Sequence, residues 1–119
     1  MATTTSDVLA HHMTCFGNGD LAGVLSDYTS ESRIFTQDGV LRGSEPIRGL
    51  FQRLLAEFGK PGASFEMIRQ DVDGDAAYIV WKAETADNRF EMATDTFIVR
   101  NGKILIQTYA AKTSPNRKT

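Results

Sequence analysis

The segment FEMATDTFIVRNGKILIQTYAAK, residues 90–112, decides the fold of this 119-residue chain. Apolar and polar residues alternate on both sides of Asn101 and Gly102, which is the pattern of a half-buried strand. Asn-Gly between two such runs is the strongest short hairpin signal, because both residues tolerate positive φ. We therefore predict two antiparallel strands, Phe90 to Arg100 and Lys103 to Lys112, joined by a tight turn.

Further strands are predicted upstream of this hairpin. Residues 64–73 and 76–85 form two of them, and Asp73-Gly74-Asp75 and Asp87-Asn88 supply the turns. Four successive strands on short turns make an antiparallel meander. A short hairpin is predicted earlier in the chain, with strands at 33–35 and 40–42 around Asp38-Gly39.

Three helices are predicted before the meander. Ser6 caps the first, which runs to about Gly17, Asp20 caps a second and shorter one, and Ser44 caps a third that ends at Gly59. Apolar residues recur at i, i+3, i+4 and i+7, which is typical of amphipathic helices. Helices first and strands last indicate the α+β class, with three N-terminal helices packed in an antiparallel sheet.

Three motifs within this order carry a family resemblance. They are FGNGDLAGVLSDY at 16–28, DGVLRG at 38–43 and DTFIVRNGKI at 95–104. Together they resemble the nuclear transport factor 2-like superfamily, and within it the SnoaL-like and ketosteroid-isomerase-like proteins. The resemblance implies a cystatin-like cone, in which a strongly curved sheet wraps the third helix and leaves a mostly apolar pocket. One such domain would span residues 1–119, with residues 113–119 as a flexible tail.

Composition narrows the class of partner. The net charge is −2 and the one basic cluster, Arg117-Lys118, falls in the expected tail, so we expect no nucleic acid partner. No apolar run approaches the ~20 residues of a membrane span, and no signal-peptide pattern is present, so we expect no membrane association. A single cysteine, Cys15, fits a reducing compartment and a cytoplasmic protein. No metal or cofactor motif is present, so we expect neither.

Asp95 is the first candidate for chemistry. Alternation places it on one strand face with Ala93, Phe97 and Val99, where desolvation raises the pKa of a carboxyl group. By the resemblance, it stands where ketosteroid isomerases keep a protonated aspartate in the oxyanion hole. The alternative is a structural aspartate, ionised and hydrogen-bonded to a tyrosine, an arginine or the backbone.

His12 is the second candidate. It lies on the apolar stripe of the first helix, and by the resemblance it falls where the isomerases place their oxyanion-hole tyrosine. A histidine there could donate to a ligand or exchange a proton near neutral pH, whereas the alternative is a histidine at the edge of the core. Cys15 follows within reach on the helix, but no third group orients a Cys–His nucleophile. His11 points about 100° away from His12, so the two make no metal pair.

Thr36 departs from the family pattern. By the resemblance, it occupies the place of the isomerases' catalytic base, and a threonine cannot serve as a general base there. We therefore expect no efficient ketosteroid isomerase. If the protein transfers protons, the base is His12 or Asp95.

Seven further residues are predicted to line the pocket and contact a ligand. Gln107 and Tyr109 share a face of the last strand that looks into the pocket in the family register, although Tyr109 fits simple packing on the sheet equally well. The others are Phe16, Phe35, Phe51, Met67 and Trp81.

Two functions stay open. The first is a SnoaL-like protein that binds a small hydrophobic cyclic molecule in the cone and isomerises, cyclises or hydrolyses it. The second is a non-catalytic interaction module with an incidental pocket. Under either function we expect a homodimer, because the face of the meander opposite the pocket is too apolar to stay exposed. That face carries Met92, Thr94, Thr96, Ile98, Ile104, Ile106 and Thr108.

Overall fold

The structure, a computed structural model, describes residues 3–116. In chain order its elements are α1 (Thr5–Gly17), α2 (Leu21–Leu25), β1 (Arg33–Thr36), β2 (Gly39–Arg42), α3 (Ser44–Phe58), β3 (Ser64–Asp73), β4 (Ala76–Glu84), β5 (Asn88–Arg100) and β6 (Lys103–Pro115). The predicted order of helices and strands is confirmed, and the fold is α+β.

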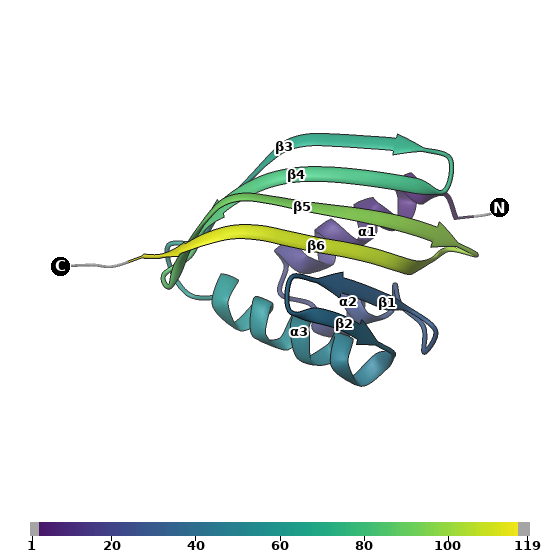
Figure 1. The fold of residues 1–119 in the computed structure, drawn as a ribbon, viewed down its shortest axis with the longest axis horizontal. Helices are drawn as coiled ribbons and strands as arrows, with labels where there is room; N and C mark the ends of the chain where they lie inside the picture. Colours follow the sequence, from purple (N-terminus) through teal and green to yellow (C-terminus); the bar gives the residue numbers. More distant parts are fainter. Residues whose placement is uncertain (1–2, 117–119) are drawn as a thin grey trace.

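The strands form one curved sheet in the order β2-β1-β6-β5-β4-β3. Helices α1 and α3 lie along one face of this sheet, as Figure 1 shows. Most neighbouring strands are antiparallel, but β1 runs parallel to β6, with Arg33 beside Ile106. The prediction of a wholly antiparallel sheet is wrong at this pair, because β1 is joined to β6 through α3 and the meander rather than by a hairpin. The sheet is therefore mixed.

Two helix caps differ from the prediction. Thr4, not Ser6, caps α1, because the Thr4 hydroxyl accepts from the Asp7 N–H while the Asp7 carboxylate accepts from the Thr4 N–H. This reciprocal pair is a capping box. Gly43, not Ser44, caps α3 at a φ of 84°, a conformation that favours glycine.

The last strand is longer than predicted. β6 pairs with β5 as far as Pro115. Asn116 follows it, and the Asn116 side-chain amide donates to the backbone carbonyl of Thr85 at 2.9 Å. Residues 113–115 thus belong to the sheet rather than to the expected flexible tail, while residues 117–119, with the basic pair, lie outside the described residues.

A β-bulge in the β5–β6 hairpin resets the side-chain alternation. Ile98 pairs with Ile106 and Val99 pairs with Ile104, so Leu105 is the extra residue on β6. Ile104 consequently points into the core and is only 1% exposed. The prediction that Ile104 shares the outer face with Ile106 is wrong, because strict alternation ends at this bulge.

The core fills the space between the concave face of the sheet and the helices. Its largest fully buried side chains are Val24, Ser32, Ile34, Ile47, Thr85, Phe97 and Ile104. The two serine and threonine hydroxyls among them are hydrogen-bonded, as buried polar groups usually are. Of the helices within residues 3–116, none is long and apolar enough to cross a membrane.

Candidate functional site

A small cavity lies between the sheet and helices α1 and α3. Its volume is about 50 Å³, which leaves room for very few water molecules. Polar side chains reach it from three elements: His12 from α1, Asp95 from β5, and Gln107 and Tyr109 from β6. The remaining lining is Met13, Phe16, Leu50, Phe51, Leu54, Phe58, Phe65, Ile79, Trp81 and Phe97. The structure therefore brings His12 and Asp95 to one apolar cavity.

Asp95 is held in the wall of this cavity by two hydrogen bonds. Trp81 Nε1 donates to Oδ1 at 2.8 Å, and Gln107 Nε2 donates to Oδ2 at 2.9 Å. Burial raises the pKa of Asp95 to about 6, although both hydrogen bonds favour the ionised form. Each oxygen keeps a second lone pair, so Asp95 can accept from a ligand or, when protonated, donate to one.

Gln107 connects Asp95 to a buried tyrosine. The Tyr28 hydroxyl donates to Gln107 Oε1, and the Gln107 amide donates in turn to Asp95. Burial, followed by the charge of Asp95, raises the pKa of Tyr28 well above its ordinary value, so Tyr28 stays a neutral donor. This chain sets which way the Gln107 amide faces and which groups Asp95 accepts from.

His12 is enclosed by aromatic rings. The rings of Tyr28, Phe51 and Phe97 meet it edge-on, with centroids 5.6–5.9 Å away. Burial, followed by the charge of His11, lowers the pKa of His12 to about 4, so the imidazole is neutral at pH 7. Within residues 3–116, His12 Nδ1 is the one fully buried side-chain nitrogen or oxygen that has no hydrogen-bond partner.

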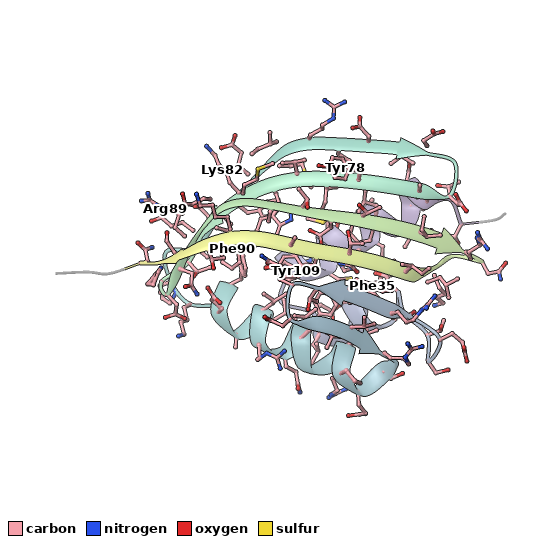
Figure 2. The ribbon with its side chains drawn as sticks, in the orientation of Figure 1. Phe35, Tyr78, Lys82, Arg89, Phe90 and Tyr109 are labelled. Carbon is pink, nitrogen blue, oxygen red and sulfur yellow. The ribbon has the colours of Figure 1, made fainter. Side chains whose placement is uncertain are left out.

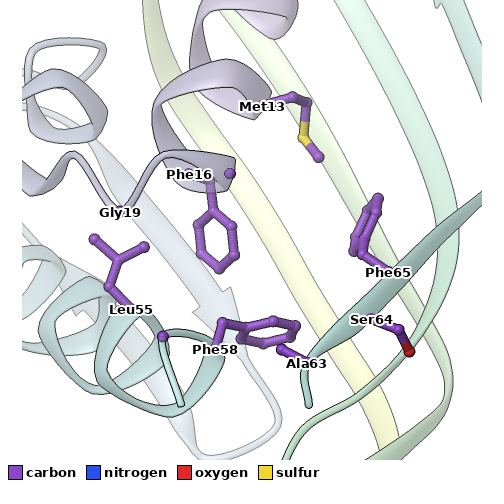
Figure 3. A pocket seen from close by; sticks show the side chains of 10 residues that line it. Met13, Phe16, Gly19, Leu55, Phe58, Ala63, Ser64 and Phe65 are labelled. Carbon is purple, nitrogen blue, oxygen red and sulfur yellow. The ribbon is translucent and has the colours of Figure 1, made fainter. Parts of the chain in front are cut away.

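A larger hollow adjoins the cavity. Its volume is about 290 Å³. The side chains that line both spaces are Met13, Phe16, Phe58 and Phe65, and Figure 3 shows them pointing into the hollow. Phe16 and Phe58 meet edge to face with centroids 5.4 Å apart. A thin wall of one methionine and three phenylalanines thus separates the open hollow from the buried polar pair.

Two of the predicted ligand contacts lie away from the cavity. Phe35 is 39% exposed, and the Arg33 guanidinium lies 5.8 Å from the centre of its ring. The inward position on β1 belongs to its neighbour Ile34, which is fully buried. Met67 packs against the core and is absent from the cavity lining. The prediction that Phe35 and Met67 line the pocket is therefore wrong. The structure places the other five in the lining: Phe16, Phe51, Trp81, Gln107 and Tyr109.

Thr36 is the last residue of β1, and its side chain binds the β1–β2 turn. Its hydroxyl donates to the Gly39 carbonyl at 2.8 Å and accepts from the Asp38 N–H at 3.2 Å. The Thr36 hydroxyl is thus occupied by two contacts within the turn, and Thr36 does not line the cavity. The polar chemistry of the cavity therefore comes from α1, β5 and β6 and not from β1.

Cys15 approaches His11 rather than His12. Its Sγ atom lies 3.4 Å from His11 Nε2, and His11 Nδ1 lies 2.8 Å from Asp27 Oδ1. Burial and the carboxylates of Asp20 and Asp27 raise the pKa of the Cys15 thiol, which keeps it protonated. This cluster is therefore not a nucleophilic cysteine site.

A third hollow, of about 490 Å³, lies over β3, β4 and β5 near the β4–β5 turn, where Figure 2 labels Lys82, Arg89 and Phe90. Four of its five charged side chains pair, Lys82 with Glu66 at 3.6 Å and Arg89 with Glu84 at 3.7 Å, and the fifth is Glu91. Exposed pairs of this kind contribute little and leave no strong field for a charged ligand. Within residues 3–116, no group of three or more His, Cys, Asp or Glu side chains could hold a metal ion.

The sequence patterns missed Asp27 and the polar role of Tyr28. Both residues follow α2, and Tyr28 was predicted only as part of that helix's apolar stripe. Asp27 is 6% exposed and lies against both histidines of α1. The only signal in the sequence is that Asp27 and Tyr28 are adjacent at the end of an amphipathic helix. Such pairs also occur at exposed positions, so the signal does not predict burial.

Comparison with a family model agrees with this architecture. The SnoaL-like domain matches residues 9–106, which is most of the chain. No curated protein matches the chain.

Solved structures share the fold at low sequence identity. An NTF2-like protein of unknown function from Mesorhizobium loti is 21% identical, with 91% of this chain and 90% of that chain covered and a TM-score of 0.77. A putative ketosteroid isomerase from Kribbella flavida is 14% identical, with 100% and 87% covered and a TM-score of 0.75. SalBIII, an epoxide hydrolase/cyclase-like enzyme in pyran ring formation in the polyether salinomycin, is 17% identical, with 91% and 90% covered and a TM-score of 0.75. Identities this low show a shared fold alone.

Proposed function

Because the chain belongs to the SnoaL-like domain family, within the nuclear transport factor 2-like superfamily, we propose that it binds a small hydrophobic cyclic molecule between His12 and Asp95 and exchanges protons with it. An apolar cavity with a few placed polar groups suits an uncharged ligand. We propose further that the protein works in the cytoplasm, since its one cysteine, Cys15, is free.

The observation that carries this proposal is that burial shifts the pKa values of two groups on one cavity in opposite directions. The pKa of Asp95 is raised to about 6 and the pKa of His12 is lowered to about 4. Between these two values Asp95 is protonated and His12 is neutral, so the cavity then holds a neutral acid and a neutral base; at pH 7 about a tenth of the molecules keep Asp95 protonated. Groups with displaced pKa values on one cavity mark candidate sites of proton transfer.

A neutral acid and a neutral base can move protons while the net charge of the protein stays the same. His12 accepts a proton from one ligand atom while Asp95 donates its own proton to another, and the ligand's bonding electrons shift between the two. Isomerisation and ring closure both follow this balance, and the fold is shared with a putative ketosteroid isomerase and an epoxide hydrolase/cyclase-like enzyme. Thr36 supplies no base in this scheme, so efficient 3-ketosteroid isomerisation is not expected.

Space for the ligand comes from joining the cavity to the adjacent hollow. At about 50 Å³ the cavity holds no ring, whereas the hollow beside it measures about 290 Å³. Together they approach the ~300–1,000 Å³ of ordinary ligand sites. Met13 is unbranched and flexible, so it is the side chain of this wall that moves most easily to join the two spaces.

Ligand binding should raise the melting temperature of the wild type. At a ligand concentration one hundred times its Kd, stabilisation is about 2.7 kcal/mol, or on the order of 10 °C for a domain of this size. Cyclic ketones, cyclic epoxides and fused aromatic compounds are the probes for a thermal-shift screen. His12→Ala and Asp95→Asn should raise the Kd of an active compound at least tenfold, as measured from the dependence of the melting temperature on its concentration.

Ile68→Ala is the matched control, because Ile68 is a large side chain that is 53% exposed and lies outside the cavity and the adjacent hollow. It should respond to the active compound as the wild type does. A wild type that responds to none of the probes, or variants of His12 and Asp95 that respond in full, would exclude the proposed site.

The second candidate function is association through the convex face of the sheet. Tyr78, Thr96, Thr108 and Phe35 lie side by side across β4, β5, β6 and β1 in register. Phe35 and Tyr78, both labelled in Figure 2, are 39% and 38% exposed, and Met92 is 52% exposed. The four side chains of this row are aromatic rings and hydroxyl groups without charge. The same face of a second copy can therefore pack against them without burying an unpaired charge. We therefore propose a homodimer, with Ile104 excluded from its interface.

Light scattering coupled to size-exclusion chromatography tests the dimer. The wild type should have about twice the chain mass of 13.1 kDa at micromolar concentration. Thr96→Arg places a bulky charge in the middle of the row and should yield a monomer, because unpaired charge at the core of an interface costs several kcal/mol. Thr14→Arg, the same change on the exposed side of α1, should leave the mass unchanged. A wild-type monomer would refute the dimer.

A further inference from the structure

The buried side of His12 faces a carboxylate that two adjacent histidines share. Asp27 Oδ1 lies 2.8 Å and Oδ2 3.0 Å from His11 Nδ1, and Oδ2 lies 3.8 Å from His12 Nδ1. The side chain of His11 is 49% exposed, while those of His12 and Asp27 are 6% and 8% exposed. Asp27 thus stands between a histidine in solvent and a histidine on the cavity.

The geometry of His12 leaves one hydrogen-bonding group unpaired. Its Nδ1 has no partner, and 3.8 Å to Asp27 is within ion-pair distance but too long for a hydrogen bond. The surrounding rings of Tyr28, Phe51 and Phe97 prevent the imidazole from turning toward another partner. A shift of less than 1 Å would make the bond to Asp27, and catalytic hydrogen bonds are often long before a ligand binds.

We propose that Asp27 is a positioning residue for His12: it keeps the proton of the neutral imidazole on Nδ1, which leaves Nε2 as the unprotonated nitrogen for the cavity ligand. His11 in turn holds the Asp27 carboxylate by a direct hydrogen bond. This inference rests on the proposed function, in which His12 accepts a proton, and it names the group that orients that base. A base oriented by a third group is the general pattern of such sites.

The tertiary structure anchors Asp27 for this role. The Ile104 N–H donates to the Asp27 backbone carbonyl at 2.7 Å, which ties the turn after α2 to β6. Six titratable groups bear on His12 and Asp27: His11 and Cys15 on α1, Asp27 itself and Tyr28 after α2, Asp95 on β5 and Lys103 on β6. Within residues 3–116, Asp27 is the one carboxylate that lies within 4.0 Å of His12 Nδ1. When Nε2 takes a proton from the ligand, Asp27 is therefore placed to accept from Nδ1–H and balance the imidazolium charge.

Nitrogen NMR of the histidine rings tests the proposal without a ligand. Protein labelled with ¹⁵N-histidine should show wild-type His12 as the Nδ1–H tautomer. Asp27→Ala removes the acceptor and should move the tautomer ratio toward Nε2–H by at least tenfold. Asp27→Asn keeps an acceptor oxygen without the charge and should fall between the two.

His11→Ala keeps the proposal testable even if the Asp27 variants fold poorly, because His11 is half exposed. Removing His11 leaves the Asp27 carboxylate free to shorten its contact with His12 Nδ1, so the Nδ1–H signal of His12 should move to the position of a stronger hydrogen bond. The accompanying rise in the pKa of His12, from loss of the His11 charge, is expected with or without a role for Asp27. Asp20→Asn is the control: Asp20 caps α2, asparagine caps as well, and the His12 signals should not move.

The outcomes separate this inference from the proposed function. An Nε2–H tautomer in the wild type, or His12 signals that are the same in wild type, Asp27→Ala and His11→Ala, would overturn the role of Asp27. The proposed function fails instead if the wild type binds none of the cyclic probes, whatever the tautomer of His12. A merely structural Asp27 would lower stability and leave the tautomer ratio of the folded protein unchanged.

Discussion

Replacing Asp95 by alanine is expected to lower the free energy of unfolding by about 2–5 kcal/mol. Asp95 accepts from Trp81 Nε1 and from Gln107 Nε2, and all three residues are at least nine-tenths buried. Alanine leaves both donors without an acceptor in a space with little room for water. Each unsatisfied buried donor costs about 1–3 kcal/mol, which outweighs the relief of not burying a carboxylate.

Urea unfolding followed by Trp81 fluorescence measures this effect, because Trp81 is the only tryptophan of the chain and touches Asp95. Asp95→Asn should lose less, about 1–3 kcal/mol, since its amide oxygen still serves one of the two donors. Asp71→Ala, an exposed aspartate paired with Arg69 on β3, is the control and should change stability by less than about 1 kcal/mol. An Asp95→Ala variant as stable as Asp71→Ala would show that the hydrogen-bond chain does not hold the fold.

The dependence of stability on pH should reverse in sign between two single variants. Asp95 binds its proton more tightly in the folded protein, where its pKa is about 6 against an ordinary 3.8, so its contribution falls as pH rises from about 4 to 6. His12 binds its proton more tightly in the unfolded chain, where its pKa is 6.5 against about 4 when folded, so its contribution grows over about pH 4 to 6.5. Each effect amounts to about 3 kcal/mol, and in the wild type they largely cancel.

Urea unfolding at a series of pH values between 4 and 6.5 exposes the two effects separately. Relative to the wild type, His12→Gln should lose about 3 kcal/mol of stability as pH rises, and Asp95→Asn should gain about as much. The double variant, which lacks both groups, serves as the control and should run parallel to the wild type. Single variants that also run parallel to the wild type would contradict the displaced pKa values of the cavity pair.

Local patterns were sufficient to predict the elements of this fold. The predicted turns at Asp38-Gly39, Gly74 and Asn101-Gly102 all lie between paired strands. Such turns depend on backbone preferences of two or three residues, which a sequence displays directly. The predicted helix starts were less accurate, since Thr4 caps α1 and Gly43 caps α3. Several polar residues stand near each helix start, and only the backbone angles decide which of them is the cap.

The bulge at Leu105 shows how far alternation extends. Before it, the faces of β5 were predicted correctly, and Asp95, Phe97 and Val99 all point inward. Across it, Ile104 on one side and Gln107 on the other share the inner face although three positions separate them. The extra residue is set by pairing with β5, and it leaves no mark in the composition of β6.

The sequence by itself determined the α+β order of elements and predicted two of the polar residues that line the cavity, His12 and Asp95. Each sits on an apolar face of its own element, so periodicity along a single helix or strand was enough to find it. Tertiary structure alone decided their partners: Trp81 and Gln107 for Asp95, and Asp27 for His12. Those contacts cross from one element to another, and their distances depend on strand register, a bulge and the anchoring of Asp27 to β6. Periodicity within one element carries no information about such distances between elements.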